Sequence, residues 1–197
     1  MMRNIERLYH LAEASNLESI LKHGLMSTER LLDAAGMSEE DRIKILRDHR
    51  QQNLRLRSGV VIRHQRPMPP TALARALDEG LQPVDWYALL NGFVFLWPDK
   101  DRMTRQRHAC GDTPQVLFTF NGIVLLDCFG PDAFVSAINS GNARRQAARR
   151  GRNTFVPYPT WIQHGWPRGQ RTRPPAEIVF RCVIPANASY VIDITEV

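Results

Sequence analysis

Apolar positions in the first half of the chain recur every three or four residues, which is the spacing of amphipathic helices. The first helix is predicted between Ser15, a capping residue, and Gly24, a helix-ending glycine. Ser27 is the predicted N-cap of a second helix over 27–35. Further helices are predicted over 39–54, 71–81, 86–90 and 99–109.

Shorter segments alternate apolar and polar positions or are apolar throughout, which predicts strands. One strand over 9–11 opens the chain, and a short buried strand follows over 60–62. Later strands are predicted over 93–97, 115–120, 124–128, 177–184 and 190–194. Helices thus crowd the first half and strands the second, and this segregation predicts an α+β fold rather than a doubly wound parallel sheet. The length of 197 residues fits a single domain over 1–197.

One long segment, over 140–175, shows neither period and is rich in glycine, proline, aromatic and basic residues. A structureless stretch of that length inside a compact domain usually belongs to function. Interleaved tryptophan and arginine side chains are typical of a platform that stacks bases and contacts the phosphates of single-stranded nucleic acid. The alternative is a loop anchored by its two tryptophans. The candidate acceptor-loop residues are Arg149, Arg150, Trp161, His164, Trp166 and Arg171.

The formal net charge of +6 and the pI near 9.7 favour phosphate-rich partners modestly. Arginine outnumbers lysine, and the planar guanidinium suits bidentate phosphate contacts. No apolar run is long enough to span a membrane, and the N-terminus lacks the apolar stretch of a secretory signal. We therefore expect a cytoplasmic protein without membrane contact.

Several other functional classes find no support in the sequence. The three cysteines are scattered and form no CxxC pair, and the six histidines show no HxxxH or HExxH spacing, so no metal site is expected. No GxGxxG, GxxxxGK[ST] or GxSxG motif occurs. This argues against a Rossmann-type dinucleotide site, a P-loop and the nucleophile elbow of a hydrolase.

Four landmarks carry a resemblance to a known family. They are the segment 9–25, with its YHL run and NLxxILxxGL pattern, the arginine-bearing helix over 45–50, the strand over 93–97, and Ala176-Glu177-Ile178-Val179. In this order they resemble the DarT-type ADP-ribosyltransferases, and more closely an uncharacterised bacterial family related to them. The resemblance spans most of the chain and is firmest at its two ends.

The resemblance implies an ADP-ribosyltransferase-like split β-sandwich, with helices mainly from the N-terminal half. NAD would lie between the first strand and strand 93–97 as the ADP-ribose donor. The expected acceptor is a base in single-stranded DNA or RNA, and an antitoxin or hydrolase partner would accompany such an enzyme. Two alternatives stay open: an NAD glycohydrolase or protein-modifying toxin with the same cleft, and a catalytically inactive module that binds nucleic acid.

The resemblance assigns catalysis to Glu177 and Arg50. A carboxylate at the start of an apolar strand would stabilise the oxocarbenium-like ribose cation and orient or deprotonate the acceptor. Arg50 would bind the pyrophosphate or brace the glutamate, with Arg47, one turn earlier, as the alternative. The expected NAD-binding residues are His10, Leu11, Gly24, Arg47, Trp97 and Asn139.

Composition by itself would give these residues ordinary roles. Glu177 would be an exposed carboxylate on an edge strand, Arg50 a solvated helix charge, and Trp97 a packing residue. His10 would be a structural histidine, and Asn139 a turn residue. The resemblance favours the functional interpretation for Glu177 and His10, both interpretations stay open for Arg50 and Trp97, and a plain turn is favoured for Asn139.

Overall fold

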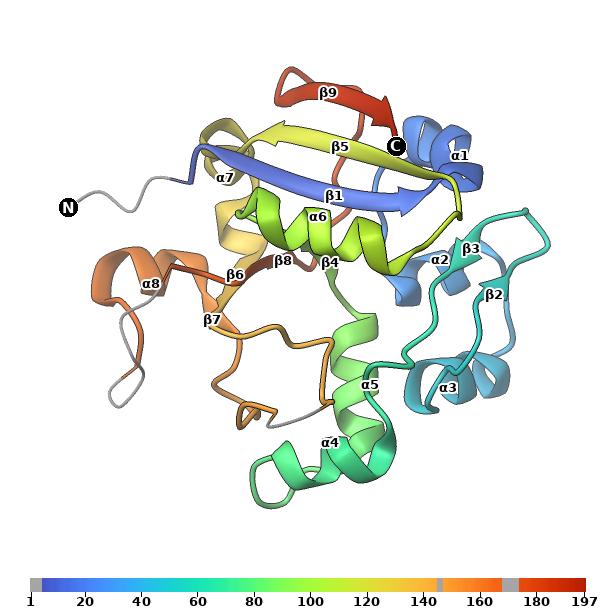
Figure 1. The fold of residues 1–197 in the computed structure, drawn as a ribbon, viewed down its shortest axis with the longest axis vertical. Helices are drawn as coiled ribbons and strands as arrows, with labels where there is room; N and C mark the ends of the chain where they lie inside the picture. Colours follow the sequence, from blue (N-terminus) through green and yellow to red (C-terminus); the bar gives the residue numbers. More distant parts are fainter. Residues whose placement is uncertain (1–4, 145–146, 168–173) are drawn as a thin grey trace.

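Two antiparallel sheets that share one hydrophobic core form the centre of the computed structural model, which describes residues 5–144, 147–167 and 174–197 (Figure 1). The first sheet has the order β1 (Arg7–Glu13), β5 (Gln115–Asn121), β9 (Val191–Glu196). The second has the order β4 (Val94–Leu96), β8 (Glu177–Phe180), β6 (Ala133–Ser136), β7 (Val156–Pro157). A separate two-stranded sheet pairs β2 (Leu54–Arg55) with β3 (Val61–Ile62).

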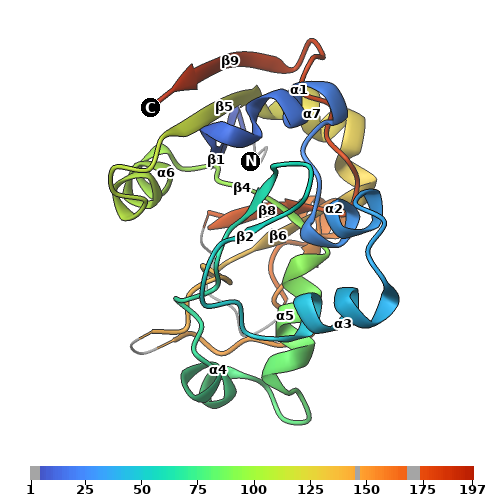
Figure 2. The same ribbon diagram turned by 90° about the vertical axis from the view of Figure 1, so that its right-hand side faces the viewer.

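Helices surround these sheets, and α5 packs on the side of the second sheet that faces away from the first (Figure 2). In chain order they are α1 (Leu17–His23), α2 (Thr28–Ala34), α3 (Glu39–Arg47), α4 (Pro70–Ala76), α5 (Pro83–Asn91), α6 (Lys100–Ala109), α7 (Gly122–Phe129) and α8 (Tyr158–His164). Two 3-10 turns, η1 (Ala14–Asn16) and η2 (Gly130–Asp132), precede α1 and β6. No helix in the described ranges is long and apolar enough to cross a membrane.

The strand β8 is buried on both faces. Ile178 and Phe180 point into the core shared by the two sheets, where Phe118 of β5 also lies. Val179, between them, belongs to a second core with Trp86 of α5. Successive side chains of a strand point to opposite faces, so a strand between two cores has to be apolar throughout. The residue that begins this strand, Glu177, is therefore placed inside the protein and is only 4% exposed.

The two sheets are joined where β4 leaves the second sheet. Tyr9 and Trp97 exchange both backbone hydrogen bonds, with N···O distances of 2.9 and 2.8 Å. The Nδ1 atom of His10 lies 2.8 Å from the carbonyl oxygen of Phe95. The first strand and the strand predicted over 93–97 are thus neighbours in space, although they lie far apart in the chain.

The prediction of an α+β fold is confirmed, and most predicted elements are present. The Ser27 hydroxyl accepts a hydrogen bond from the Arg30 amide at the start of α2, as expected of an N-cap. The segregation of helices and strands is weaker than predicted, because two helices that were not predicted, α7 and α8, lie in the second half. The predicted helices over 39–54 and 71–81 end early, at Arg47 and Ala76.

The strand predicted over 124–128 is wrong, because this run is the helix α7. Its buried residues are Gly122, Leu125 and Leu126, which is helical spacing, and the Asn121 side chain accepts a hydrogen bond from the Val124 amide at the helix start. A short apolar run does not distinguish a strand from a buried helix by itself. The prediction that 140–175 lacks secondary structure is also wrong in part, because it contains β7 and α8.

Replacing Gly24 by alanine is expected to destabilise the protein by about 2 kcal/mol or more. Gly24 has φ +81°, and a Cβ atom there would lie 2.7 Å from the Ile184 carbonyl oxygen. That oxygen cannot retreat easily because it accepts a hydrogen bond from the Leu25 amide at 2.8 Å. Urea denaturation measures the effect.

Gly80 provides the control, since it has φ +82° but no atom within 4 Å of the position that a Cβ atom would take. Gly80→Ala therefore isolates the cost of the positive φ, and about 1 kcal/mol is expected. Equal losses in the two variants would contradict a steric role for Ile184.

Candidate functional site

A cavity of about 1160 Å³ opens beside β1 and β4. Pockets for small molecules usually enclose roughly 300–1,000 Å³, so this one has room for a dinucleotide. Among its lining residues are the predicted site residues His10, Leu11, Gly24, Arg50, Trp97, Asn139 and Glu177. These positions come from both ends and the middle of the sequence, and the fold gathers them around one space.

Glu177 is held by Ser140. The Ser140 hydroxyl donates to Oε2 at 2.6 Å, and its backbone N–H lies 3.1 Å from Oε2 and 3.2 Å from Oε1. Burial raises the pKa of Glu177 from 4.5 to about 7, although the two Ser140 hydrogen bonds and the charges of Arg102 and Arg150 oppose this rise. A carboxyl group with a pKa near neutrality can exchange a proton with a reacting group.

Arg150 fixes the position of Ser140. It is 2% exposed, and its Nη1 and Nη2 atoms donate to the carbonyl oxygens of Ser140 and Asn142, both at 2.9 Å. Its Nε donates to the Ala148 carbonyl at 3.1 Å. The Trp86 indole N–H also reaches the Ser140 carbonyl, at 3.3 Å, and the guanidinium lies 5.9 Å from the Trp86 ring centre. Arg150 is thus part of the site's internal support.

His10 is neutral at physiological pH, because burial lowers its pKa to about 4. A carbonyl oxygen can only accept, so the contact with Phe95 requires the proton on Nδ1. The Nε2 atom is then left as an acceptor. An imidazole in this form can receive a hydrogen bond from a hydroxyl or amide of a ligand in the cavity.

Arg50 lines the cavity and is braced by three residues. Its Nε donates to the Arg63 carbonyl at 2.8 Å, Nη1 to the Ile45 carbonyl at 3.4 Å and Nη2 to the Asn91 side chain at 3.3 Å. Burial lowers its pKa to about 10, so it remains charged at neutral pH. A guanidinium has five N–H groups, so these bonds still leave donors for a ligand.

Arg47, the alternative to Arg50, is not among the cavity residues. It is exposed and pairs with Asp85 at 2.7 Å. The helix α3 ends at Arg47, and the chain then turns, so the two arginines do not share a helix face as expected. The structure brings only Arg50 to the predicted site.

A buried polar cluster at the cavity was not anticipated from the sequence. Glu13, at the end of β1, accepts from Arg63 Nε at 3.0 Å and from Gln115 Nε2 at 3.0 Å, and Arg63 also donates to Gln115. Glu13 and Gln115 are buried. Glu13 ends the strand β1 and Gln115 begins the strand β5. A polar residue at the end of an apolar strand was the one feature of the sequence that could have indicated this cluster. The arrangement holds the Arg63 guanidinium at the cavity in one orientation.

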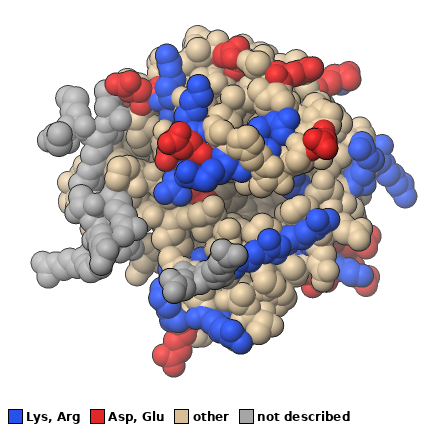
Figure 3. All heavy atoms as spheres, viewed as in Figure 1, with Lys and Arg blue, Asp and Glu red and all other residues tan. Residues whose placement is uncertain are grey.

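The cavity is strongly basic. Among the described residues, four arginines line it, Arg50, Arg63, Arg66 and Arg144, which we call the cavity arginines. Glu13 and Glu177 are the carboxylates that line it within the same ranges. In Figure 3 basic side chains flank the hollow in the middle of the visible face. Such an excess of positive charge attracts anionic ligands.

Most of the predicted acceptor loop lies elsewhere, and several of its assignments need correction. Trp161 is 4% exposed and packs in the core beside Trp166, with ring centres 5.6 Å apart, so it offers no open face to a base. Arg150 is buried rather than available to phosphates. Arg149 and His164 are exposed but are not cavity residues. Arg171 lies outside the described residues.

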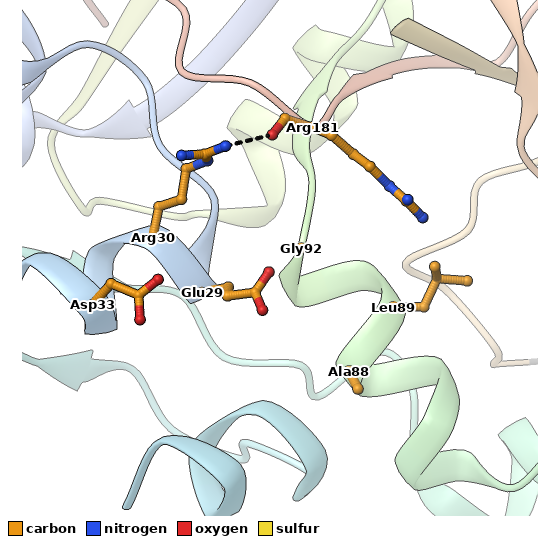
Figure 4. A pocket seen from close by; sticks show the side chains of 7 residues that line it. All are labelled: Glu29, Arg30, Asp33, Ala88, Leu89, Gly92 and Arg181. Atoms are coloured by element: carbon orange, nitrogen blue, oxygen red, sulfur yellow. Dashed lines mark hydrogen bonds between the residues drawn. The ribbon is translucent and has the colours of Figure 1, made fainter. Parts of the chain in front are cut away.

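A second hollow, of about 400 Å³, lies between α2 and the end of α5 (Figure 4). Its lining residues are Glu29, Arg30, Asp33, Ala88, Leu89, Gly92 and Arg181. Much of its charge is used within the protein, since Asp33 pairs with Arg42 at 2.6 Å and Arg30 donates to the Arg181 carbonyl at 3.2 Å. It holds no predicted site residue.

The described residues also contain no group of three or more His, Cys, Asp or Glu side chains that could hold a metal ion.

Comparison with protein families identifies a match for this chain. A family described as "Family of unknown function (DUF7002)" matches residues 6–191, which include β1, β5, the whole second sheet and all the cavity residues. No curated protein matches the sequence.

Proposed function

Because the chain belongs to DUF7002, a family of unknown function, we propose its activity from the cavity: an NAD-dependent mono-ADP-ribosyltransferase whose acceptor is a nucleic-acid base. One observation carries this proposal. His10, Arg50 and Glu177, which the resemblance to DarT-type enzymes selects from distant parts of the sequence, line the same cavity. Two antiparallel sheets joined at β1 and β4 are also compatible with an ADP-ribosyltransferase-like split β-sandwich.

The chemistry would be centred on Glu177. The bond between the nicotinamide nitrogen and the ribose breaks, its electron pair leaves with nicotinamide, and positive charge develops on the ribose. An ionised carboxylate in a buried site stabilises that charge more strongly than it would in water. An acceptor nitrogen or oxygen then bonds to the ribose carbon, and its proton passes to Glu177, whose pKa near 7 suits the transfer.

Several cavity groups fit the donor. The guanidinium groups of Arg50 and Arg63 match the bidentate geometry of a pyrophosphate. The free Nε2 of His10 can accept from a ribose hydroxyl or the nicotinamide amide. Phe95 and Trp97 are half-buried at the cavity wall and offer aromatic surface for the rings of NAD.

The test is to incubate the protein with NAD labelled in its adenine part, together with single-stranded DNA, RNA or a protein mixture. Transfer of label to DNA or RNA with release of nicotinamide supports the proposal. Label that ends as free ADP-ribose indicates an NAD glycohydrolase, and label on protein indicates a protein-modifying enzyme. NAD that is bound but never cleaved in any mixture would leave only an inactive binding module.

The cavity arginines are the observation that favours a nucleic-acid acceptor. Burial and the charges of Arg66, Arg63 and Arg144 lower the pKa of His64, so these cations converge around one side chain. Arg66 and Arg144 are exposed, and each is tied to a backbone carbonyl, Arg66 to Gln51 at 2.7 Å and Arg144 to Arg66 at 3.2 Å. Repulsion among such charges is relieved when phosphates bind.

We expect the double variant Arg66→Gln/Arg144→Gln to bind a single-stranded oligonucleotide at least about tenfold more weakly at low salt. If both arginines contact phosphates, the slope of log Kd against log salt should fall by about 1.4. Fluorescence anisotropy with DNA and with RNA oligonucleotides measures both quantities. Arg149→Gln is the matched control, since Arg149 is exposed but pairs with Asp78 outside the cavity. Because the double variant removes two charges and Arg149→Gln removes one, an equal loss for each charge removed would assign the effect to net charge alone.

A further inference from the structure

The described parts of one loop, 139–144 and 147–150, carry the two side chains most closely linked to Glu177. Ser140 is fully buried and contacts the carboxylate with both its hydroxyl and its backbone N–H. Arg150 holds the loop from inside by donating to three of its carbonyl oxygens, those of Ser140, Asn142 and Ala148. We propose that Ser140 and Arg150 are positioning residues that aim the Glu177 carboxylate and favour its ionised form. This inference rests on the proposed function for its catalytic meaning.

The geometry of Arg150 explains why an arginine is needed. Its three nitrogens reach three separate carbonyls at 2.9, 2.9 and 3.1 Å, and a planar guanidinium spreads its donors over these three nitrogens, whereas the donors of an ammonium share a single nitrogen. The charge is buried, and the Trp86 ring covers it at 5.9 Å. The many arginines in this part of the sequence suggest that Arg150 binds phosphate. In the structure its guanidinium instead donates to backbone carbonyls of its own loop.

The geometry of Ser140 explains how the carboxylate is aimed. The shortest contact, 2.6 Å from the hydroxyl, is to Oε2, while Oε1 receives the longer 3.2 Å contact from the backbone N–H. Oε1 therefore keeps most of its accepting capacity for a ligand in the cavity that Glu177 lines. Ser140 thus fixes Oε2 of Glu177 and leaves Oε1 available to a ligand.

Hydrogen bonds to the ionised form of a carboxyl group lower its pKa, so their loss raises it. The charged groups that act on Glu177 are Arg102 of α6 and Arg150, and both favour the ionised form. The flanking strands β4 and β6 contain no titratable side chain, and Ser136 stands opposite Glu177 in the register. Ser140→Ala should consequently raise the pKa of Glu177 further, by about one pH unit or more.

The experiment is a carboxyl-carbon NMR titration of protein labelled at glutamate, with the Glu177 signal assigned from its absence in Glu177→Gln. The pH dependence of kcat/KM for NAD cleavage is measured on the same variants. In Ser140→Ala we expect the titration midpoint and the acidic limb of the rate profile to move upward together. Activity lost near neutral pH should then return at higher pH, which a merely structural defect would not allow.

Ser136→Ala is the matched control. Ser136 is as buried as Ser140 and lies beside Glu177, but its hydroxyl donates to the Ile138 carbonyl at 3.1 Å. In Ser136→Ala the midpoint of the Glu177 titration should stay at the native value. Arg150→Lys keeps the positive charge and loses the three-carbonyl contact, so a raised midpoint there reports displacement of Ser140 rather than lost charge.

The inference is overturned if Ser140→Ala leaves the midpoint unchanged or lowers it, or if Ser136→Ala raises it equally. An increase in activity at neutral pH in Ser140→Ala would also overturn it, since Ser140 would then be holding the carboxylate away from its substrate. The titration does not depend on turnover. A shifted midpoint in a protein that never cleaves NAD would refute the proposed function while supporting the positioning role.

Discussion

Replacing Glu177 by glutamine is expected to slow NAD cleavage by about 10²- to 10³-fold, the usual cost of removing one group that stabilises transition-state charge. Glutamine keeps the size of the side chain and can still accept from Ser140, but it carries no negative charge. Affinity for NAD should change only a few-fold, because the charge is needed mainly as the ribose becomes cationic. Nicotinamide release measures the rate, and calorimetric titration measures binding.

Glu29→Gln is the appropriate control for this prediction. Glu29 is an exposed glutamate that lines the second hollow and not the cavity, so its variant should keep native turnover. Retention of more than about a tenth of native activity by Glu177→Gln would show that another group stabilises the ribose cation. Glu13 also lines the cavity with a carboxylate, but it is paired with Arg63.

The same substitution is expected to stabilise the folded protein at pH 8 by up to about 3 kcal/mol, at roughly 1.36 kcal/mol for each pH unit of pKa change. The pKa of Glu177 rises from 4.5 to about 7 on folding, mainly through burial. The native state therefore holds this proton more tightly than the unfolded chain. Below pH 4.5 both states are protonated and ionisation costs nothing. As pH rises to about 7, the unfolded carboxyl ionises first and stability is lost, and above about pH 7 the loss is constant.

Urea denaturation of the native protein and Glu177→Gln at about pH 8 and about pH 4.5 tests this sign. The stabilising effect of the substitution should be large at the higher pH and should nearly vanish at the lower one. If the difference in the free energy of unfolding between the two proteins did not depend on pH, burial would not raise the pKa of Glu177. A protein that is more stable without its proposed catalytic group would illustrate the general trade-off between stability and activity.

Local patterns in the sequence were enough for most elements of the fold. The N-cap at Ser27 and the helix end at Gly24 depend on residues within one turn, and both were predicted. The alternation of Val116, Phe118 and Phe120 marks β5 as a strand with one face in the core. The short apolar run over 124–128 failed because strand and buried helix share that pattern, and the Asn121 cap with the close approach of Gly122 to Ile5 selects the helix.

The candidate site was only partly visible in the sequence. Glu177, His10 and Arg50 were selected by resemblance, and the structure places all three at one cavity. The arginines and tryptophans over 149–166 were predicted to face nucleic acid because their composition suits it. Composition does not report burial, however, and Trp161 and Arg150 are inside the protein.

The sequence by itself determined where most helices and strands begin, the α+β class, the basic charge and the carboxylate at the head of an apolar strand, because these depend on near neighbours and on residue type. Only the tertiary structure decided that Ser140 meets Glu177 across 37 residues, and that Arg63, Glu13 and Gln115 form one cluster. Such contacts arise from the pairing of distant strands and from the carbonyl positions of a folded loop. Periodicity carries no information about either, and so the chemistry of the site became apparent only after the chain was folded.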